Sequence, residues 1–272
     1  MTSRISSLAV GRSRILPFAF ALILGVLSPA WTMLAKSPGP AIGETLKIPV
    51  GTVLPVSLEH ALSSKDLVKG EAIEGRLMQD VLLPNRDKIP AGSKLNGSIV
   101  KVVSTENGPA SITLRFSSLE SKHVNFSIVV ALRAIATFEA VQSAQLPYQE
   151  SASGSPAAWA TTLQIGGDIR YGDGGKVTNH HNRKIGKATT NGGVLGPLED
   201  DPGSPCAGWP DATHGPQALW VFSASACGPY DMKPIRIARA GNKEPFGEIT
   251  LTKEVGEIKL MKSSGLLLRV VQ

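Results

Sequence analysis

Residues 48–58 read Ile-Pro-Val-Gly-Thr-Val-Leu-Pro-Val-Ser-Leu, and residues 89–99 read Ile-Pro-Ala-Gly-Ser-Lys-Leu-Asn-Gly-Ser-Ile. Both stretches follow the frame I-P-x-G-[TS]-x-L-x-x-S-[LI]. In each copy proline fixes φ and the glycine two places later accepts a positive φ, which predicts a turn. The residues that follow alternate between apolar and polar, as in a half-buried strand. Two such strand entries predict a mainly β protein built on a small β-barrel or sandwich.

Short runs rich in β-branched residues surround the repeat. From residue 46 to residue 142 they alternate with turn clusters, so we expect this stretch to form a β-barrel domain. Near the end of this stretch, the composition is also compatible with a short helix around residues 132–141. The predicted strands are residues 52–58, 72–77, 80–83, 94–103, 111–119 and 124–132.

The middle of the chain has a different composition. Residues 143–217 are rich in Gly, Ser, Pro, Asn and Asp and show no regular apolar period, which predicts a long irregular insertion. After it, residues 218–272 contain a group of short antiparallel strands that either completes the barrel or forms a second small sheet. These strands are predicted at residues 218–223, 235–238, 247–251, 257–261 and 265–271.

The N-terminus predicts export. Three arginines precede an apolar run at residues 15–27, and Ser28-Pro29-Ala30 supplies small residues for cleavage, so residues 1–30 read as a signal peptide. The alternative is a retained membrane anchor, because residues 15–35 carry no charge and are long enough to span a bilayer. Residues 31–45 read as a linker. We expect the protein in the periplasm, in the cell envelope or outside the cell.

Net charge argues against a nucleic-acid partner. The chain has a formal charge of +6, of which the three leader arginines supply half, so residues 31–272 carry only +3. There is no dense run of Lys and Arg and there are few aromatic residues to stack on bases.

The chain has two cysteines, Cys206 and Cys227. In an oxidising compartment an isolated pair predicts one disulfide bond. Closing a loop of this length would contribute about 3 kcal/mol by the chain-entropy model.

Two common motifs of enzymes are absent from the sequence. There is no G-x-S-x-G nucleophile elbow, and residues 171–176 lack the G-x-x-x-x-G-K-[ST] spacing of a phosphate loop, so they read as a glycine turn. We therefore expect no catalytic residue and no cofactor. This predicts a structural or binding module rather than an enzyme.

Three histidines, His180, His181 and His214, are weak candidates for metal ligands. They would support an alternative function as a metal-dependent hydrolase. Neighbouring histidines point apart in an extended chain, and nothing resembles H-E-x-x-H, so a solvated loop is the favoured interpretation.

Aromatic residues of the insertion offer a candidate binding surface. Trp209, Tyr171 and Trp159 lie in this segment, where they would stack on sugars or anchor a protein partner. The expected partner is a cell-wall glycan or an envelope protein.

The first β block resembles a known family. The resemblance lies in residues 61–66 (Ala-Leu-Ser-Ser-Lys-Asp), 70–71 (Gly-Glu), 79–81 (Gln-Asp-Val) and 89–97, and it extends over about residues 46–135. These stretches are similar to the C-terminal β-barrel of TrbI-like scaffold proteins of type IV secretion and conjugation systems. The resemblance implies a structural barrel without catalytic residues that associates with copies of itself or with envelope partners. Its full form would be a scaffold subunit of a secretion channel.

Overall fold

The computed structural model describes residues 47–83, 87–122, 124–145, 161–179, 181–188, 194–199, 206 and 217–272. Within these residues the protein is mainly β, as the sequence predicts. The predicted signal peptide at 1–30, the alternative anchor at 15–35 and the predicted linker at 31–45 lie outside them. In the described part, no helix has the length and apolar character needed to cross a membrane.

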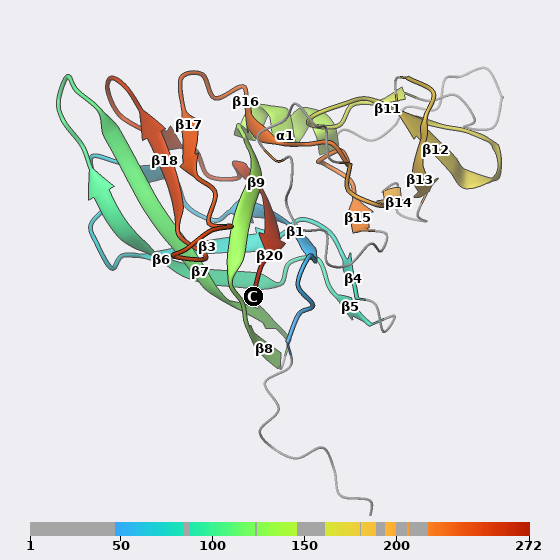
Figure 1. Ribbon diagram of the computed structural model, residues 1–272, viewed down its shortest axis with the longest axis horizontal. Helices are drawn as coiled ribbons and strands as arrows, with labels where there is room; N and C mark the ends of the chain where they lie inside the picture. The colour runs from blue at the N-terminus through green and yellow to red at the C-terminus, as the bar shows by residue number, and fades with distance from the viewer. Residues whose placement is uncertain are drawn as a thin grey trace, which may run out of the picture. The chain divides into compact units, whose positions relative to one another are not determined.

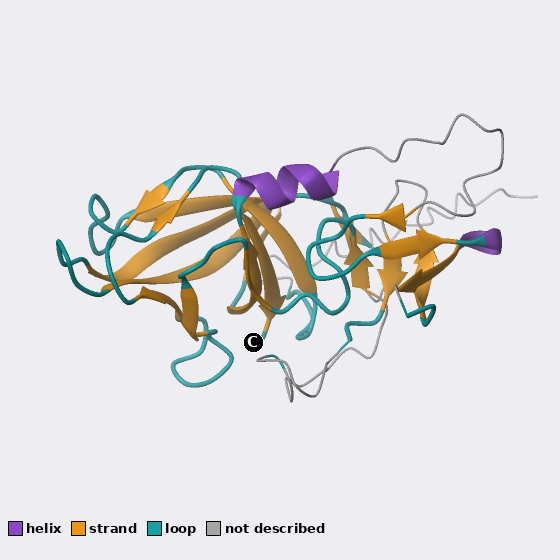
Figure 2. Cartoon of the chain, turned by 90° about the horizontal axis from the view of Figure 1, so that it is seen from above, coloured by secondary structure: helices purple, strands orange, loops and turns teal. Residues whose placement is uncertain are grey.

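Ten strands among the described residues form one sheet that curls into a nearly closed barrel (Figures 1 and 2). Strands from the C-terminal stretch lie in the same sheet as those of the first block. In sheet order the strands are β16 (Gly228–Tyr230), β9 (Val130–Ala136), β20 (Gly265–Val270), β1 (Val53–Leu58), β3 (Ala72–Leu77), β6 (Lys94–Val103), β7 (Ala110–Ser121), β18 (Ile249–Lys253) and β17 (Arg236–Arg239), with β8 (Val124–Ser127) paired to β7.

The two copies of the repeated frame form the same turn. In the first copy, the backbone N–H and the hydroxyl of Thr52 both donate to the Pro49 carbonyl, at 3.1 and 2.7 Å. In the second copy, Ser93 donates in the same way to Pro90, at 3.3 and 2.8 Å. The glycine of the frame has a φ of 90° in the first copy and 80° in the second, which explains why it is a glycine. The strands that follow, β1 and β6, lie on either side of β3.

The two ends of the sheet, β16 and β17, contact each other without pairing as strands, so the barrel is nearly closed. The Leu132 N–H of β9 donates to the Ala240 carbonyl just after β17, at 2.7 Å. Buried apolar side chains fill the interior, among them Leu54, Leu95 and Phe116. The inside of the barrel is therefore a packed core, as expected for a barrel of this size.

A second sheet lies within the segment that the sequence predicts to be irregular. Each of its four middle strands buries one aliphatic side chain, namely Ile169, Val177, Ile185 and Val194. With one buried aliphatic residue per strand, the sequence shows no regular apolar period. Among the described residues this antiparallel sheet consists of β10 (Thr161–Thr162), β11 (Ile169–Tyr171), β12 (Lys176–Asn179), β13 (Lys184–Ala188), β14 (Val194–Gly196) and β15 (Gln217–Leu219).

The buried face of the second sheet packs against the outside of the barrel and against α1 (Phe138–Gln145), shown in purple in Figure 2. The barrel contributes Ala134 of β9 and Leu267 of β20 to this second core, and α1 contributes Val141. The helix starts later than predicted because residues up to 136 belong to β9. Thr137 caps it, since its hydroxyl oxygen accepts a hydrogen bond from the Ala140 N–H at 3.2 Å.

The remaining strands form two small pairs. Asp80, beside the first of them, links it to the turn of the second repeat copy: its carboxylate accepts hydrogen bonds from Lys88 Nζ at 2.8 Å and from the Ala91 N–H at 2.9 Å. These two bonds lower the pKa of Asp80 below its usual value. The pairs are β4 (Val81–Leu82) with β5 (Lys88–Ile89), and β2 (Leu62–Ser63) with β19 (Lys259–Leu260).

Candidate functional site on the second sheet

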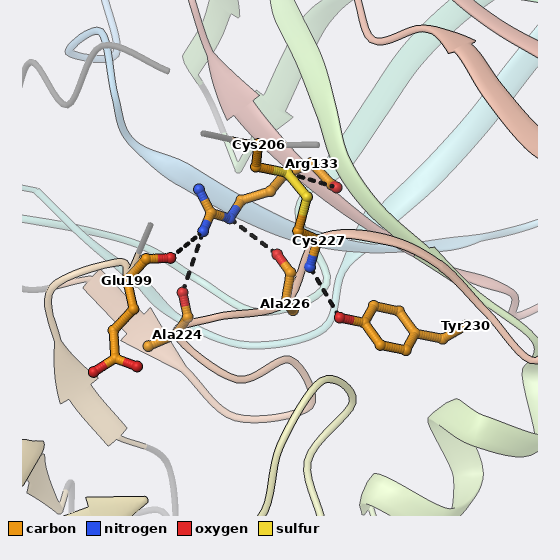
Figure 3. The surroundings of a disulfide bond; sticks show 7 residues. All are labelled: Arg133, Glu199, Cys206, Ala224, Ala226, Cys227 and Tyr230. Carbon is orange, nitrogen blue, oxygen red and sulfur yellow. Dashed lines mark hydrogen bonds between the residues drawn. A yellow bond between two sulfur atoms is a disulfide. The ribbon is translucent and has the colours of Figure 1, made fainter. Parts of the chain in front are cut away.

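A buried arginine fixes the second sheet to the barrel. Arg133 belongs to β9 and is 1% exposed. Among the described residues, its guanidinium donates to the backbone carbonyls of Ala226, from Nε at 3.0 Å, and of Glu199 and Ala224, from Nη2 at 2.6 and 3.4 Å (Figure 3). These carbonyls belong to the segments just after β14 and just before β16. One side chain therefore holds two loops against the barrel strand.

The predicted disulfide is confirmed: Cys206 and Cys227 are bonded, with Cα atoms 6.0 Å apart. The bond lies beside Arg133, whose carbonyl oxygen is 3.5 Å from Cys206 Sγ (Figure 3). The Cys227 N–H donates to the Tyr230 hydroxyl at 3.0 Å. The disulfide thus adds a covalent tie at the same junction, and the second sheet has a fixed support.

The other face of the second sheet carries cations. Arg170 of β11 lies directly opposite Thr178 of β12, which lies opposite Lys184 of β13. Lys176 of β12 lies opposite Lys187 of β13. Paired residues in antiparallel strands project from the same face, and the four cationic side chains are exposed. We call these five residues the basic face.

No acidic residue balances the basic face within its sheet. Strands β10 to β15 contain neither Asp nor Glu. Among the described residues, no ion pair joins the four cations to a carboxylate. The nearby Arg183 differs, because its guanidinium pairs with Glu199 at 2.9 Å. Lys176 and Lys187 are like charges directly opposite each other, an arrangement that destabilises a sheet.

Two tight turns connect strands β11, β12 and β13. Gly174 and Gly175, with φ of 66° and 73°, form the turn from β11 to β12, so the glycine turn of the sequence is a hairpin turn. Between β12 and β13, the Asn179 side-chain oxygen accepts from the backbone N–H groups of His181 and Arg183, each at 3.0 Å. Both turns are made by the residue types that such turns require.

Of the binding and metal residues predicted from the sequence, the structure describes Tyr171 and His181. Tyr171 lies at the end of β11, partly buried against the second core and therefore on the side away from the basic face. His181 is exposed in the turn after β12. Within the described part of the chain, no group of three His, Cys, Asp or Glu side chains is placed to hold a metal. Trp159, Trp209, His180 and His214 lie outside the described residues, so their roles stay predictions.

The basic face was missed in the sequence because charge was averaged over the chain. Residues 168–188 contain five Lys or Arg and two Asp, a net charge of +3. Residues 31–272 also carry +3 in total, so the rest of that stretch is neutral. A local charge count would have marked this segment as basic, whereas the register that brings its cations together is given only by the structure.

Comparison of the chain with protein-family models, with curated proteins and with solved structures found no match. The resemblance of residues 46–135 to TrbI-like barrels therefore stays a prediction, as does the scaffold role that it implies.

Proposed function

We propose that this protein is an exported, non-enzymatic binding module of the cell envelope. The barrel is its platform, and the second sheet presents the binding surface. The observation that carries the proposal is the two-sided use of the second sheet: one face packs against the barrel and α1, and the other is exposed and bears four cations without partners among the described residues.

The support for this surface favours a binding role. Binding surfaces work best on rigid elements whose own position is fixed by packing and hydrogen bonds. Here the strands pack on the second core, and the loops beside them are held by hydrogen bonds from Arg133 and by the Cys206–Cys227 disulfide. A disulfide is also compatible with an exported protein, because such bonds persist in oxidising compartments.

Co-sedimentation tests the proposal. Full-length protein, purified with its disulfide intact, would be mixed with washed cell walls and washed membranes prepared from its own cells. We expect saturable binding to one of these fractions at physiological salt. No saturable binding to either fraction would contradict a binding role, and a ring-sized assembly in light scattering would favour the secretion-channel scaffold instead.

A further inference from the structure

We propose that the basic face binds an acidic polysaccharide, a glycan chain that carries carboxylate or phosphate groups along its length. This inference rests on the proposed function and gives its ligand a chemical class. The cations that carry it are Arg170, Lys176, Lys184 and Lys187, with the hydroxyl of Thr178 among them.

The spacing of the cations fits a polymer. Neighbouring strands lie about 4.8 Å apart and alternate residues of one strand about 7 Å apart, so the basic face covers roughly 10 by 7 Å at the level of its backbone. Long, exposed lysine side chains extend this reach further. A surface of this kind meets several charged groups of one chain at once. Arg170 adds directed recognition, because a guanidinium binds a carboxylate or a phosphate through two parallel hydrogen bonds.

The residues of the basic face favour an acidic polysaccharide over a lipid bilayer and over single-stranded nucleic acid. Peripheral binding to a bilayer uses exposed aromatic or large aliphatic side chains beside the cations. Within β11 to β13 the large aliphatic side chains, Ile169, Val177 and Ile185, are buried on the opposite face. Single-stranded nucleic acid is held by stacking on aromatic side chains, and Tyr171 packs toward the second core.

The repulsion between Lys176 and Lys187 supports a bound anion. Like charges directly opposite each other weaken a sheet, and an anionic group between them would relieve that repulsion. A residue kept at a cost to stability is typical of a functional surface. Neutralising one of the pair should therefore stabilise the free protein and weaken binding, whereas a purely structural residue would not move the two in opposite directions.

Binding of defined polymers tests the inference. Full-length, oxidised protein would be titrated with polygalacturonate, a glycan that carries carboxylates, and with phosphorylated dextran, a glycan that carries phosphates, and separately with neutral dextran, oligo(dT) and phosphatidylglycerol vesicles. We expect one of the two linear anionic polymers to bind best, with an affinity that falls as salt rises. The double variant Lys176→Gln/Lys187→Gln should bind about tenfold or more weakly. Lys187→Gln alone should raise the melting temperature of the free protein.

The matched control is Lys101→Gln/Lys259→Gln, which removes the same charge from exposed lysines outside the second sheet. We expect it to change affinity less than about twofold. Equal weakening by both double variants would overturn the inference, because binding would then follow net charge alone. Tighter binding to vesicles or to oligo(dT) would overturn it as well.

The two proposals fail in different ways. If the Lys176→Gln/Lys187→Gln variant binds cell walls or membranes as well as the parent protein does, the inference is overturned. The proposal of a binding module then still stands. Absence of binding to every envelope fraction would overturn both.

Discussion

A single buried residue, Arg133, connects the two parts of the fold. It extends from a barrel strand and donates to the carbonyls of Glu199, Ala224 and Ala226. Hydrogen bonds from a charged donor are stronger than neutral ones, and buried carbonyls left without a donor lose their solvation without compensation.

We expect Arg133→Met to lower the free energy of unfolding by about 3 kcal/mol, measured by urea denaturation. The matched control is Arg236→Met, which removes a guanidinium whose partner Glu254 is, like Arg236 itself, 74% exposed. That change should cost no more than about 0.5 kcal/mol, because exposed ion pairs contribute little. Equal effects of the two substitutions would show that Arg133 does not hold the junction.

The lowered pKa of Asp80 predicts that the stability of the fold depends on pH. Its pKa is lowered by the hydrogen bond from Lys88 and by that from the Ala91 N–H. A carboxylate whose folded-state pKa is depressed stabilises the fold above its unfolded pKa, about 3.9, and this contribution is lost as the pH falls through the folded value. Asp80→Asn should therefore be less stable than the parent protein at pH 7, and the difference should shrink below about pH 4.

Urea denaturation at neutral and acidic pH measures this difference. Glu106→Gln is the control, since it neutralises an exposed carboxylate elsewhere in the barrel loops. A stability difference for Asp80→Asn that does not change with pH would mean that its charge is not the stabilising feature.

At the scale of elements, the sequence predicted the barrel strands better than the second sheet. The bounds predicted for residues 72–77 and 94–103 coincide with β3 and β6, because both strands alternate in burial and begin beside recognisable turns. The turn of the repeated frame needs only bonds between residues three apart, so it is readable from local sequence. The strands of the second sheet are two to five residues long, and the core beneath them is completed by residues of the barrel and α1. That packing partner is not visible in the local pattern.

The contact between the second core and the barrel needs a glycine. Gly265 lies on β20, and a Cβ there would be 2.6 Å from Val141 Cγ2 and 3.1 Å from Phe222 Cζ. Gly265→Ala should therefore destabilise the protein by about 1–3 kcal/mol through overpacking, as measured by urea denaturation. The control is Gly172→Ala, because a Cβ at that position would meet its nearest neighbour at 3.6 Å, an ordinary contact. If the two variants were equally stable, α1 and the Phe222 loop would not be packed tightly on β20.

At the scale of the whole molecule, most of the buried apolar residues and the net positive charge lie in different parts of the chain. The barrel holds most of the buried apolar residues, and residues 168–188 hold a net charge equal to that of all of residues 31–272. The sequence predicted one part of the junction, the Cys206–Cys227 pair, because two isolated cysteines in a chain predicted to be exported indicate one disulfide. It did not predict the basic face, since the four cations come from three strands and meet only through their register.

Lysine acetylation footprinting of the full-length, oxidised protein, with and without washed cell walls from its own cells, tests the central claim most directly. Mass spectrometry would follow the reactivity of each exposed lysine. The account predicts that Lys176, Lys184 and Lys187 become several-fold less reactive when cell walls are present, and that Lys101 and Lys259 react as before. Unchanged reactivity of the three lysines in the presence of bound cell walls, or protection confined to Lys101 and Lys259, would contradict it.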